Sequence, residues 1–165
     1  MPTTQTTGRA TTKAKAPTPS KDAIGMLRAD HQAVSALFAD YENKHTKAQK
    51  KALVAEICTA LSAHAQIEEE IFYPAVKAAL KDKFLVPEAT VEHAGVKRLI
   101  SEIEGVEPDG EMFDAKVKVL AEYVKHHVKE EQNEMFPKAR NTSLDMDQLG
   151  AAMAKRKAEL LAATH

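Results

Sequence analysis

Apolar residues recur at spacings of three and four along most of the chain, which is the period of a helix with one face in a core. The first stripe follows Ser20 and Asp22, either of which can cap a helix by accepting a backbone N–H bond. Its members are Ile24, Leu27, His31, Val34, Phe38 and Tyr41. The pattern predicts a first helix with a histidine in the middle of its apolar face.

A second stripe begins after Thr46 to Gln49, which has the form of a capping box. Its inner positions are Leu53, Ile57, Leu61, His64, Glu68 and either Ile71 or Phe72. Pro74 lacks a backbone N–H, so we expect it to kink or end the helix, with a short extension to about Leu80.

Three more helices are predicted in the second half of the chain. The third begins at Pro87 and stops at Gly105, with the inner residues His93, Val96, Ile100 and Ile103. The fourth is capped by Asp109 and ends at Pro137, with the inner residues Phe113, Val117, Leu120, Val124, His127, Glu131 and Met135. Ser143 is expected to cap a shorter fifth helix that contains Leu149, Met153 and Leu160.

The short connections between the main helices favour antiparallel neighbours. The predicted fold is therefore all-α, an up-down antiparallel four-helix bundle with a short extra C-terminal helix packed outside it. Residues 1–20 contain almost no large apolar side chain and are predicted to be a disordered tail rich in Thr, Pro and Lys. The bundle is expected to span residues 21–140 and the C-terminal helix residues 141–165.

Composition narrows the class of protein. The 165 residues are 44% hydrophobic and 28% charged, which suits one domain with a real core. The formal net charge of −1 gives no strong field for nucleic acid or an anionic membrane, and no segment has the length of a transmembrane helix. No apolar segment of a secretory signal is present. We expect a cytoplasmic monomer or weak homo-oligomer.

Cys58 is the only cysteine, which excludes an internal disulfide and a cysteine-rich metal site. A small buried apolar residue on a helix is the expected role of this thiol, in preference to a reactive one.

Two stretches of the chain resemble each other closely. Residues 64–74 read HAQIEEEIFYP and residues 127–137 read HVKEEQNEMFP. In each, a histidine is followed four residues later by a glutamate, and this spacing places both side chains on one face of a helix. The sequence therefore contains two matching half-sites that each offer a nitrogen and an oxygen ligand.

One histidine lies on the apolar face of each main helix, and the middles of antiparallel helices lie at the same level. Six groups can therefore converge: His31, His64, Glu68, His93, His127 and Glu131. A lone core histidine is usually a structural residue, and an isolated His/Glu pair is usually a surface ion pair. Burying both glutamates without a cation would be unfavourable, whereas a dinuclear metal centre removes that cost. Imidazole and carboxylate ligands suit iron, manganese or zinc.

The arrangement resembles the hemerythrin-like HHE cation-binding family over roughly residues 22–140. The matching segments are Asp30-His31, His64 with Glu68-Glu69 and Phe72-Tyr73-Pro74, Glu92-His93, and His127 with Glu131 and Phe136-Pro137. The resemblance implies two non-haem iron ions, oxo- or carboxylate-bridged, with Glu68 and Glu131 as bridges and the histidines as terminal ligands. Manganese and zinc are the alternative metals.

Three positions depart from the pattern of the oxygen-carrying hemerythrins. Lys97 stands where they have a second histidine on the third helix. Their last carboxylate is an aspartate five residues after its histidine, whereas here it is Glu131, four residues after His127. Ala65 stands where some relatives have a glutamate. The predicted ligand set of four nitrogens and two carboxylates leaves coordination positions for water, dioxygen or peroxide.

Several residues near the predicted ligands could also bind the metals or contact them. His126 is an alternative to His127 as the ligand of the fourth helix, Glu69 or Glu92 could supply a further oxygen, and Tyr123 could hydrogen-bond near the metals. Each is otherwise a solvent-facing or core residue.

Three functions are compatible with these residues. The first is a non-haem di-iron protein that binds or senses dioxygen, peroxide, nitric oxide or iron, as in a stress response. The second is a di-iron enzyme that decomposes peroxide in the manner of a catalase. The third is a metal-free structural or interaction bundle. Nucleic acid and membrane partners are not expected.

Overall fold

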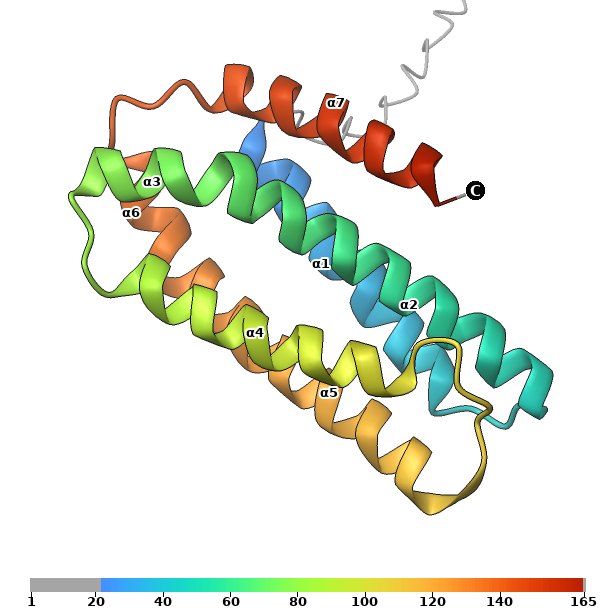
Figure 1. Cartoon of the computed structure of the whole chain (residues 1–165). Coiled ribbons are helices and arrows are strands. Elements are labelled where there is room, and N and C mark those ends of the chain that lie inside the picture. Colours follow the sequence, from blue (N-terminus) through green and yellow to red (C-terminus); the bar gives the residue numbers. More distant parts are fainter. Residues whose placement is uncertain (1–21, 165) are drawn as a thin grey trace, which may run out of the picture.

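The computed structural model describes residues 22–164, and within this range every regular element is helical (Figure 1). The long helices are α1 (Ala23–Tyr41), α2 (Lys47–Ile67), α4 (Leu85–Ile103), α5 (Gly110–Glu130) and α7 (Met146–Ala163). The shorter ones are α3 (Tyr73–Leu80) and α6 (Phe136–Arg140), and each follows a π-helical turn, η1 (Glu68–Phe72) and η2 (Glu131–Met135). The predicted all-α class is confirmed. The predicted tail, residues 1–20, lies outside the described residues.

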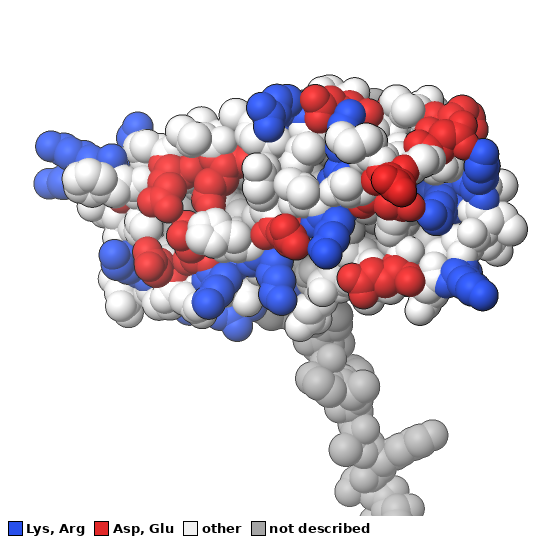
Figure 2. Space-filling view, turned by 90° about the horizontal axis from the view of Figure 1, so that it is seen from below, with Lys and Arg blue, Asp and Glu red and all other residues white. Residues whose placement is uncertain are grey.

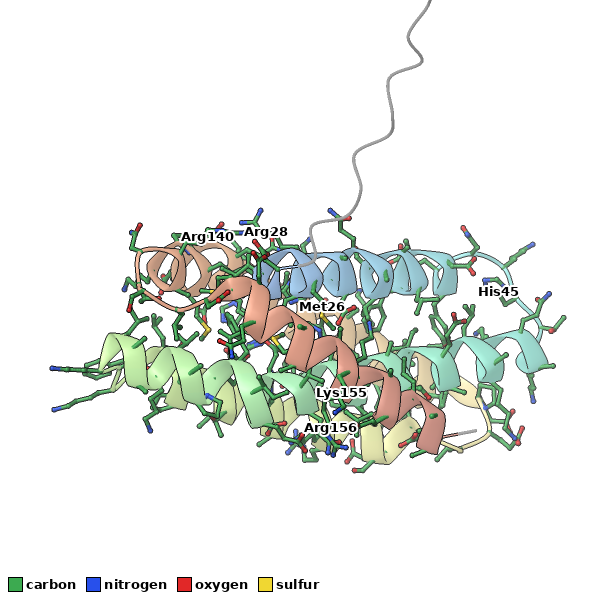
Figure 3. All side chains as sticks on the ribbon, turned by 90° about the horizontal axis from the view of Figure 1, so that it is seen from above. Met26, Arg28, His45, Arg140, Lys155 and Arg156 are labelled. Atoms are coloured by element: carbon green, nitrogen blue, oxygen red, sulfur yellow. The ribbon has the colours of Figure 1, made fainter. Side chains whose placement is uncertain are left out.

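Consecutive long helices run in alternate directions, as Figure 1 shows. Helix α1 packs against α2, and α4 packs against α5. Helix α7 contacts α1, α2 and η1, and Figure 3 shows it lying across the first two of these helices. None of the helices in the described range is both long and apolar enough to cross a membrane.

The C-terminal helix is longer than predicted, and its cap is a different residue. With 18 residues, α7 is nearly as long as the 19-residue α1, so the expectation of a short extra helix is wrong. Its N-cap is Asp145 instead of Ser143, and the Asp145 carboxylate accepts from the backbone N–H groups of Asp147 and Gln148. The helix continues to Ala163 because its sequence contains strong helix formers and no proline.

Both prolines of the repeated motif follow a π-helical turn. The backbone N–H of Tyr73 bonds to the carbonyl of Glu68, five residues earlier. A proline has no N–H, and its ring clashes with the carbonyl four residues before it, so a wider turn ahead of it relieves the clash. The predicted extension beyond Pro74 to Leu80 is confirmed.

The second copy behaves in the same way, which corrects the predicted end of the fourth helix. The N–H of Phe136 bonds to the carbonyl of Glu131, and the helix passes through Pro137 and continues to Arg140. The π turn accommodates the proline, so the proline does not end the helix.

The predicted capping residues of α1 and α2 are confirmed, and α4 has an additional one. The Asp22 carboxylate accepts from Gly25 N–H at 2.6 Å, and Thr46 and Gln49 form the reciprocal bonds of a capping box. The addition is Asp82, whose carboxylate accepts from the backbone N–H groups of Leu85 and Val86. Helix α4 therefore begins at Leu85, two residues before the predicted start at Pro87.

The connection between α4 and α5 is only partly as predicted. Gly105 has a φ of +71°, a left-handed conformation that favours glycine, and it follows the end of α4 as expected. Asp109 occupies the N-cap position of α5, but its carboxylate makes no capping hydrogen bond and pairs with Lys47 instead.

The core consists of two apolar clusters separated by a layer of buried polar residues. One cluster contains Ile24, Leu27, Ile67, Phe72, Val86, Met135 and Phe136, with Met153 of α7. The other contains Val34, Val54, Ile57, Cys58, Leu61, Val96, Ile100, Phe113 and Leu120. Each histidine on the long helices α1, α2, α4 and α5 lies in sequence between members of the two clusters.

A few predicted inner positions lie at the edge of this core. Leu53 is half-buried, while Val54 and Cys58 are buried together with Ile57 and Leu61. The buried set has the spacing of three and four residues of a helix face, and Leu53 lies at its margin.

Cys58 provides a direct test of this packing. Burial, with a smaller contribution from the charge of Glu104, raises the pKa of its thiol from 9.0 to about 12. We expect the folded protein to resist a thiol reagent at pH 8 and the urea-unfolded protein to react at once, since the thiolate is the nucleophile. Above pH 9 the unfolded state binds fewer protons than the folded state, so stability should fall as the pH rises from 9 towards 12. Rapid labelling of the folded protein would contradict the buried position.

Candidate metal centre

The polar layer between the two apolar clusters contains all six residues predicted to be ligands. Helices α1, α2, α4 and α5 each supply one histidine, and the first residue of each π turn is one of the glutamates. The exposed fractions are 8% for His31, 8% for His64, 0% for Glu68, 4% for His93, 6% for His127 and 2% for Glu131. Four helices therefore bring the predicted groups together in the interior.

The histidines form two pairs, and Glu131 lies between them. The ring centroids of His31 and His64 are 4.9 Å apart, and those of His93 and His127 are 4.8 Å apart. One carboxylate oxygen of Glu131 is 3.1 Å from Nε2 of His31, and the other is 3.2 Å from Nε2 of His127. The two oxygens of Glu131 therefore face different histidine pairs.

Glu68 also contacts both pairs. Its Oε1 atom is 2.9 Å from Nε2 of His64 and 3.5 Å from Nε2 of His93. Two groups of potential ligands result, in each of which the ligand atoms lie within 4.8 Å of one another. The groups are His31 with His64 and Glu131, and Glu68 with His93 and His127.

Several of these buried atoms have no hydrogen bond of acceptable geometry within residues 22–164. They are Nε2 of His31 and His64, Nδ1 of His93, both carboxylate oxygens of Glu68 and Oε1 of Glu131. Buried polar atoms are normally hydrogen-bonded, and a buried carboxylate must be paired or coordinate a metal. The donor set of imidazole nitrogens and carboxylate oxygens fits cations held between the two histidine pairs.

Charges in the centre compensate one another strongly. Burial alone would lower the pKa of His64, but the carboxylates of Glu68 and Asp30 raise it to about 10. Burial also opposes protonation of His127, and Glu131 raises its pKa to about 9. Burial would raise the pKa of Glu68, yet His64 holds it well below its ordinary value. Glu68 therefore stays ionised, and metal ions would replace the protons that otherwise balance the carboxylates.

Acids outside the centre orient two of the histidines. Oδ2 of Asp30 is 2.9 Å from Nδ1 of His64, and Oε1 of Glu92 is 2.9 Å from Nδ1 of His127. A carboxylate at Nδ1 holds the proton there and leaves Nε2 free to bind a metal, which is the usual arrangement around metal-ligating histidines. Asp30 and Glu92 therefore lie behind the ligands and not among them.

The other two histidines have weaker outer partners. The side-chain amide of Gln132 is 3.0 Å from Nδ1 of His31, and a carboxylate oxygen of Glu69 is 3.7 Å from Nδ1 of His93. Both oxygens of Glu69 accept from Lys97 at 2.7 Å. Lys97 is thus turned away from the centre and held by Glu69.

The Tyr73 side chain lies in the centre, although the sequence pattern did not predict it there. Its hydroxyl donates to Oε2 of Glu131 at 2.5 Å and lies 3.2 Å and 3.1 Å from Nε2 of His93 and His127. Burial, followed by the charges of the two core glutamates, raises the pKa of Tyr73 well above its ordinary value. The hydroxyl therefore keeps its proton and acts as a hydrogen-bond donor inside the centre.

The residues weighed as alternatives lie elsewhere. Tyr123 is 45% exposed and the side chain of His126 is 65% exposed, so neither lies in the buried polar layer. The π turn explains the omission of Tyr73, because it places the residue five positions after Glu68 on the inner face. The repeat could have indicated this position, because Tyr73 and Phe136 are aromatic residues at the same place in its two copies.

The two halves of the chain supply corresponding residues. The pairs are Asp30 with Glu92, His31 with His93, His64 with His127, Glu68 with Glu131, Glu69 with Gln132, and Tyr73 with Phe136. The Phe136 ring stacks on His31 with centroids 6.0 Å apart, and the Tyr73 ring lies 5.3 Å from that of His93. The hydroxyl of Tyr73 is thus a chemical difference between two otherwise similar groups of potential ligands.

The fold and the buried histidines and glutamates define a helical cation-binding protein. The sequence matches the profile of the hemerythrin family, described as the hemerythrin HHE cation binding domain, over residues 22–139. The chain belongs to this family, and the resemblance drawn from the sequence is confirmed.

Two known proteins show how far the similarity extends. A DNA nickase of Nostoc sp. is 30% identical over 116 residues, which are 70% of this chain but only 33% of the nickase. The crystal structure of a hemerythrin HHE cation binding domain-containing protein from Mycobacterium kansasii has a TM-score of 0.71 and 24% identity, covering 84% of this chain and 86% of the other. That structure supports the fold.

Helix α7 lies beyond the residues matched by the family profile, and one of its side chains contacts the acid behind His64. The ammonium of Lys157 donates to Oδ1 of Asp30 at 2.5 Å, on the far side of the carboxylate from His64. Arg156, labelled in Figure 3, pairs with Glu70 of η1. Burial alone would raise the pKa of Asp30, but His64 and Lys157 lower it.

We therefore expect Lys157→Met to destabilise the protein, because the side chain of Asp30 is only 11% exposed and would lose one of its two cationic partners. The free energy of unfolding in urea, followed by circular dichroism, should fall by about 1–3 kcal/mol. The control is Lys155→Met on the exposed face of the same helix, which should change it by less than about 0.5 kcal/mol. Equal losses in the two variants would show that the contact with Asp30 contributes nothing specific.

Proposed function

We propose that this protein holds two iron ions, one in each group of ligands, and uses them to bind or sense dioxygen, peroxide or nitric oxide. The supporting observation is that Glu131 directs one oxygen at each histidine pair, at 3.1 Å from His31 and 3.2 Å from His127. Bridging carboxylates from facing helices are the usual way in which bundles hold two ions. In this proposal α1, α2, α4 and α5 form the functional four-helix bundle.

Iron is proposed because imidazole and carboxylate ligands suit it, although the same ligands accept manganese or zinc. The protein ligands are few enough to leave coordination positions for a small exogenous molecule. A cavity of about 30 Å³ adjoins the histidines and has apolar walls from Val34, Leu61, Val96 and Val124. One water molecule needs about 10–15 Å³ of such a volume, so the cavity has room for a small ligand such as dioxygen.

Peroxide decomposition is the second candidate, and Tyr73 favours it. A bound iron pair would supply redox and Lewis-acid chemistry. Disproportionation of hydrogen peroxide to water and dioxygen also requires protons to move between the two peroxide molecules. The Tyr73 hydroxyl, whose pKa is raised by burial and then by Glu68 and Glu131, donates its proton to Glu131 beside Nε2 of His93 and His127. A metal-free bundle, the third possibility, gives no role to the unbonded ligand atoms.

Metal content is the first test. Protein produced with ample iron should contain about two ions per chain. The His64→Ala, Glu68→Ala double variant should lose most of this iron, while His45→Ala, a change at a histidine outside the polar layer, should keep it. Elemental analysis of both variants, with an optical spectrum, measures the outcome.

Removal of the iron by a chelator should lower the melting temperature, because the site is assembled from four helices and exists only in the folded chain. Iron-free and iron-loaded proteins that melt together would favour the metal-free bundle. Protein that holds at most one ion of any metal would contradict the two-iron assignment.

Tyr73→Phe tests the enzymatic candidate. The substitution keeps the ring, as Phe136 does in the other half of the chain, and removes only the hydroxyl. Iron content should stay unchanged, and the rate of peroxide consumption by the iron-loaded protein should fall at least ~10-fold because a positioned proton donor is lost. Tyr123→Phe, at an exposed tyrosine, is the matched control and should have no effect. Peroxide rates that do not differ between the two variants would leave Tyr73 with a packing role only.

A further inference from the structure

The sequence HHVKEE at residues 126–131 contains a second His/Glu pair, shifted by one residue from the buried one. Nε2 of His126 is 3.1 Å from Oε1 of Glu130, at the same spacing of four residues as His127 and Glu131. A shift of one residue turns a side chain by about 100° around the helix axis. The side chains of His126 and Glu130 are accordingly 65% and 33% exposed.

Glu92 of α4 joins the exposed pair to the buried centre. One of its oxygens is 3.6 Å from Nε2 of His126, and the other is 2.9 Å from Nδ1 of His127. The ligand atoms of Glu92, His126 and Glu130 lie within 4.8 Å of one another, as in the two buried groups. We call these three residues the outer group.

A small cavity borders two residues of the outer group and two of the centre. Its volume is about 10 Å³, and its walls include Glu88, Glu92 and Glu130 as well as the buried His127 and Glu131. Glu131 is 2% exposed, and its Oε1 atom has no hydrogen-bond partner among the described residues. The cavity is about large enough for one water molecule, so the same space borders surface carboxylates and the buried carboxylate of Glu131.

The charges around the outer group also favour a cation. The neighbouring Glu130 carboxylate raises the pKa of Glu88, which indicates that two acids are held close together. Within residues 22–164 no lysine or arginine nitrogen lies within 4 Å of a carboxylate oxygen of Glu88, Glu92 or Glu130, whereas Glu69 and Glu70 pair with Lys97 and Arg156. Figure 2, which views the molecule from the side of α4 and α5, shows acidic side chains gathered in several places on this face, with lysines and arginines interspersed.

We propose that Glu92, His126 and Glu130 form a solvent-facing site for a divalent transition-metal cation such as Fe²⁺ or Mn²⁺. From this site the cation passes to the buried centre. One imidazole and two carboxylates are suitable ligands for both ions. The delivery role rests on the proposed function, whereas binding at the outer group does not. The competing interpretation is a surface ion pair between His126 and Glu130, which would contribute little.

Binding is tested by adding Mn²⁺ to iron-loaded protein and following the loss of the electron paramagnetic resonance signal of free Mn²⁺. The wild type should bind a further ion, and His126→Ala, Glu130→Gln should bind it at least ~10-fold more weakly, because affinity depends on the number of charged ligands. Glu122→Gln, an exposed change one turn earlier on α5, is the control and should bind like the wild type. Equal Mn²⁺ affinity in all three proteins would overturn the site.

Delivery is tested by mixing iron-free protein with Fe²⁺ and recording the absorbance of the filling centre over time. The double variant should fill at least ~10-fold more slowly than the wild type and the Glu122→Gln control, since local charge concentrates cations and raises association rates. The final iron content should be equal in all three. Equal filling rates would overturn the delivery role.

The two failures are distinguishable. If the wild type takes no iron into the centre, the proposed function and the delivery role both fall. Titration of the metal-free protein with Mn²⁺ would then still decide whether the outer group binds a cation, because the loss of binding in His126→Ala, Glu130→Gln depends only on surface residues.

Discussion

Two carboxylates buried between apolar clusters are the constraint on which the rest of the structure depends. Glu68 and Glu131 are almost wholly removed from water, and neither lies near a lysine or arginine within the described range. Each of the four helices around them contributes a histidine, so positive charge from protons or metal ions can enter the layer. The apolar clusters on both sides hold the four helices at one level and thereby fix the positions of these six groups.

The π turns connect this constraint to the sequence. A proline six residues after each glutamate forces a wider turn, and that turn begins at the glutamate itself. It brings the residue five positions after the glutamate onto the inner face, where Tyr73 covers His93 and Phe136 covers His31. A backbone feature set by proline therefore decides which aromatic ring closes each side of the polar layer.

Periodicity was enough to predict the class of fold and the six converging groups, because apolar spacing and the position of a histidine within a stripe are local properties of the sequence. Tyr73 was not predictable in this way, since a regular helix with 3.6 residues per turn places Phe72, and not Tyr73, on the same face as Glu68. The contact between Lys157 and Asp30 was also beyond such reasoning. This contact depends on how α7 lies across α1 and α2, and the sequence of α7 alone does not indicate which helices it packs against.

The outer acids give the two halves of the centre different surroundings. Asp30, behind His64, is covered by Lys157 of α7, whereas Glu92, behind His127, faces the exposed His126. Tyr73 adds its hydroxyl on the same side as His127. The group formed by Glu68, His93 and His127 is therefore the one beside the Tyr73 hydroxyl and beside an acid that also faces an exposed histidine. The group formed by His31, His64 and Glu131 instead has the Phe136 ring against His31 and Lys157 of α7 against Asp30. The two halves of the chain thus repeat the same histidines and glutamates but differ in the protons and charges that surround them.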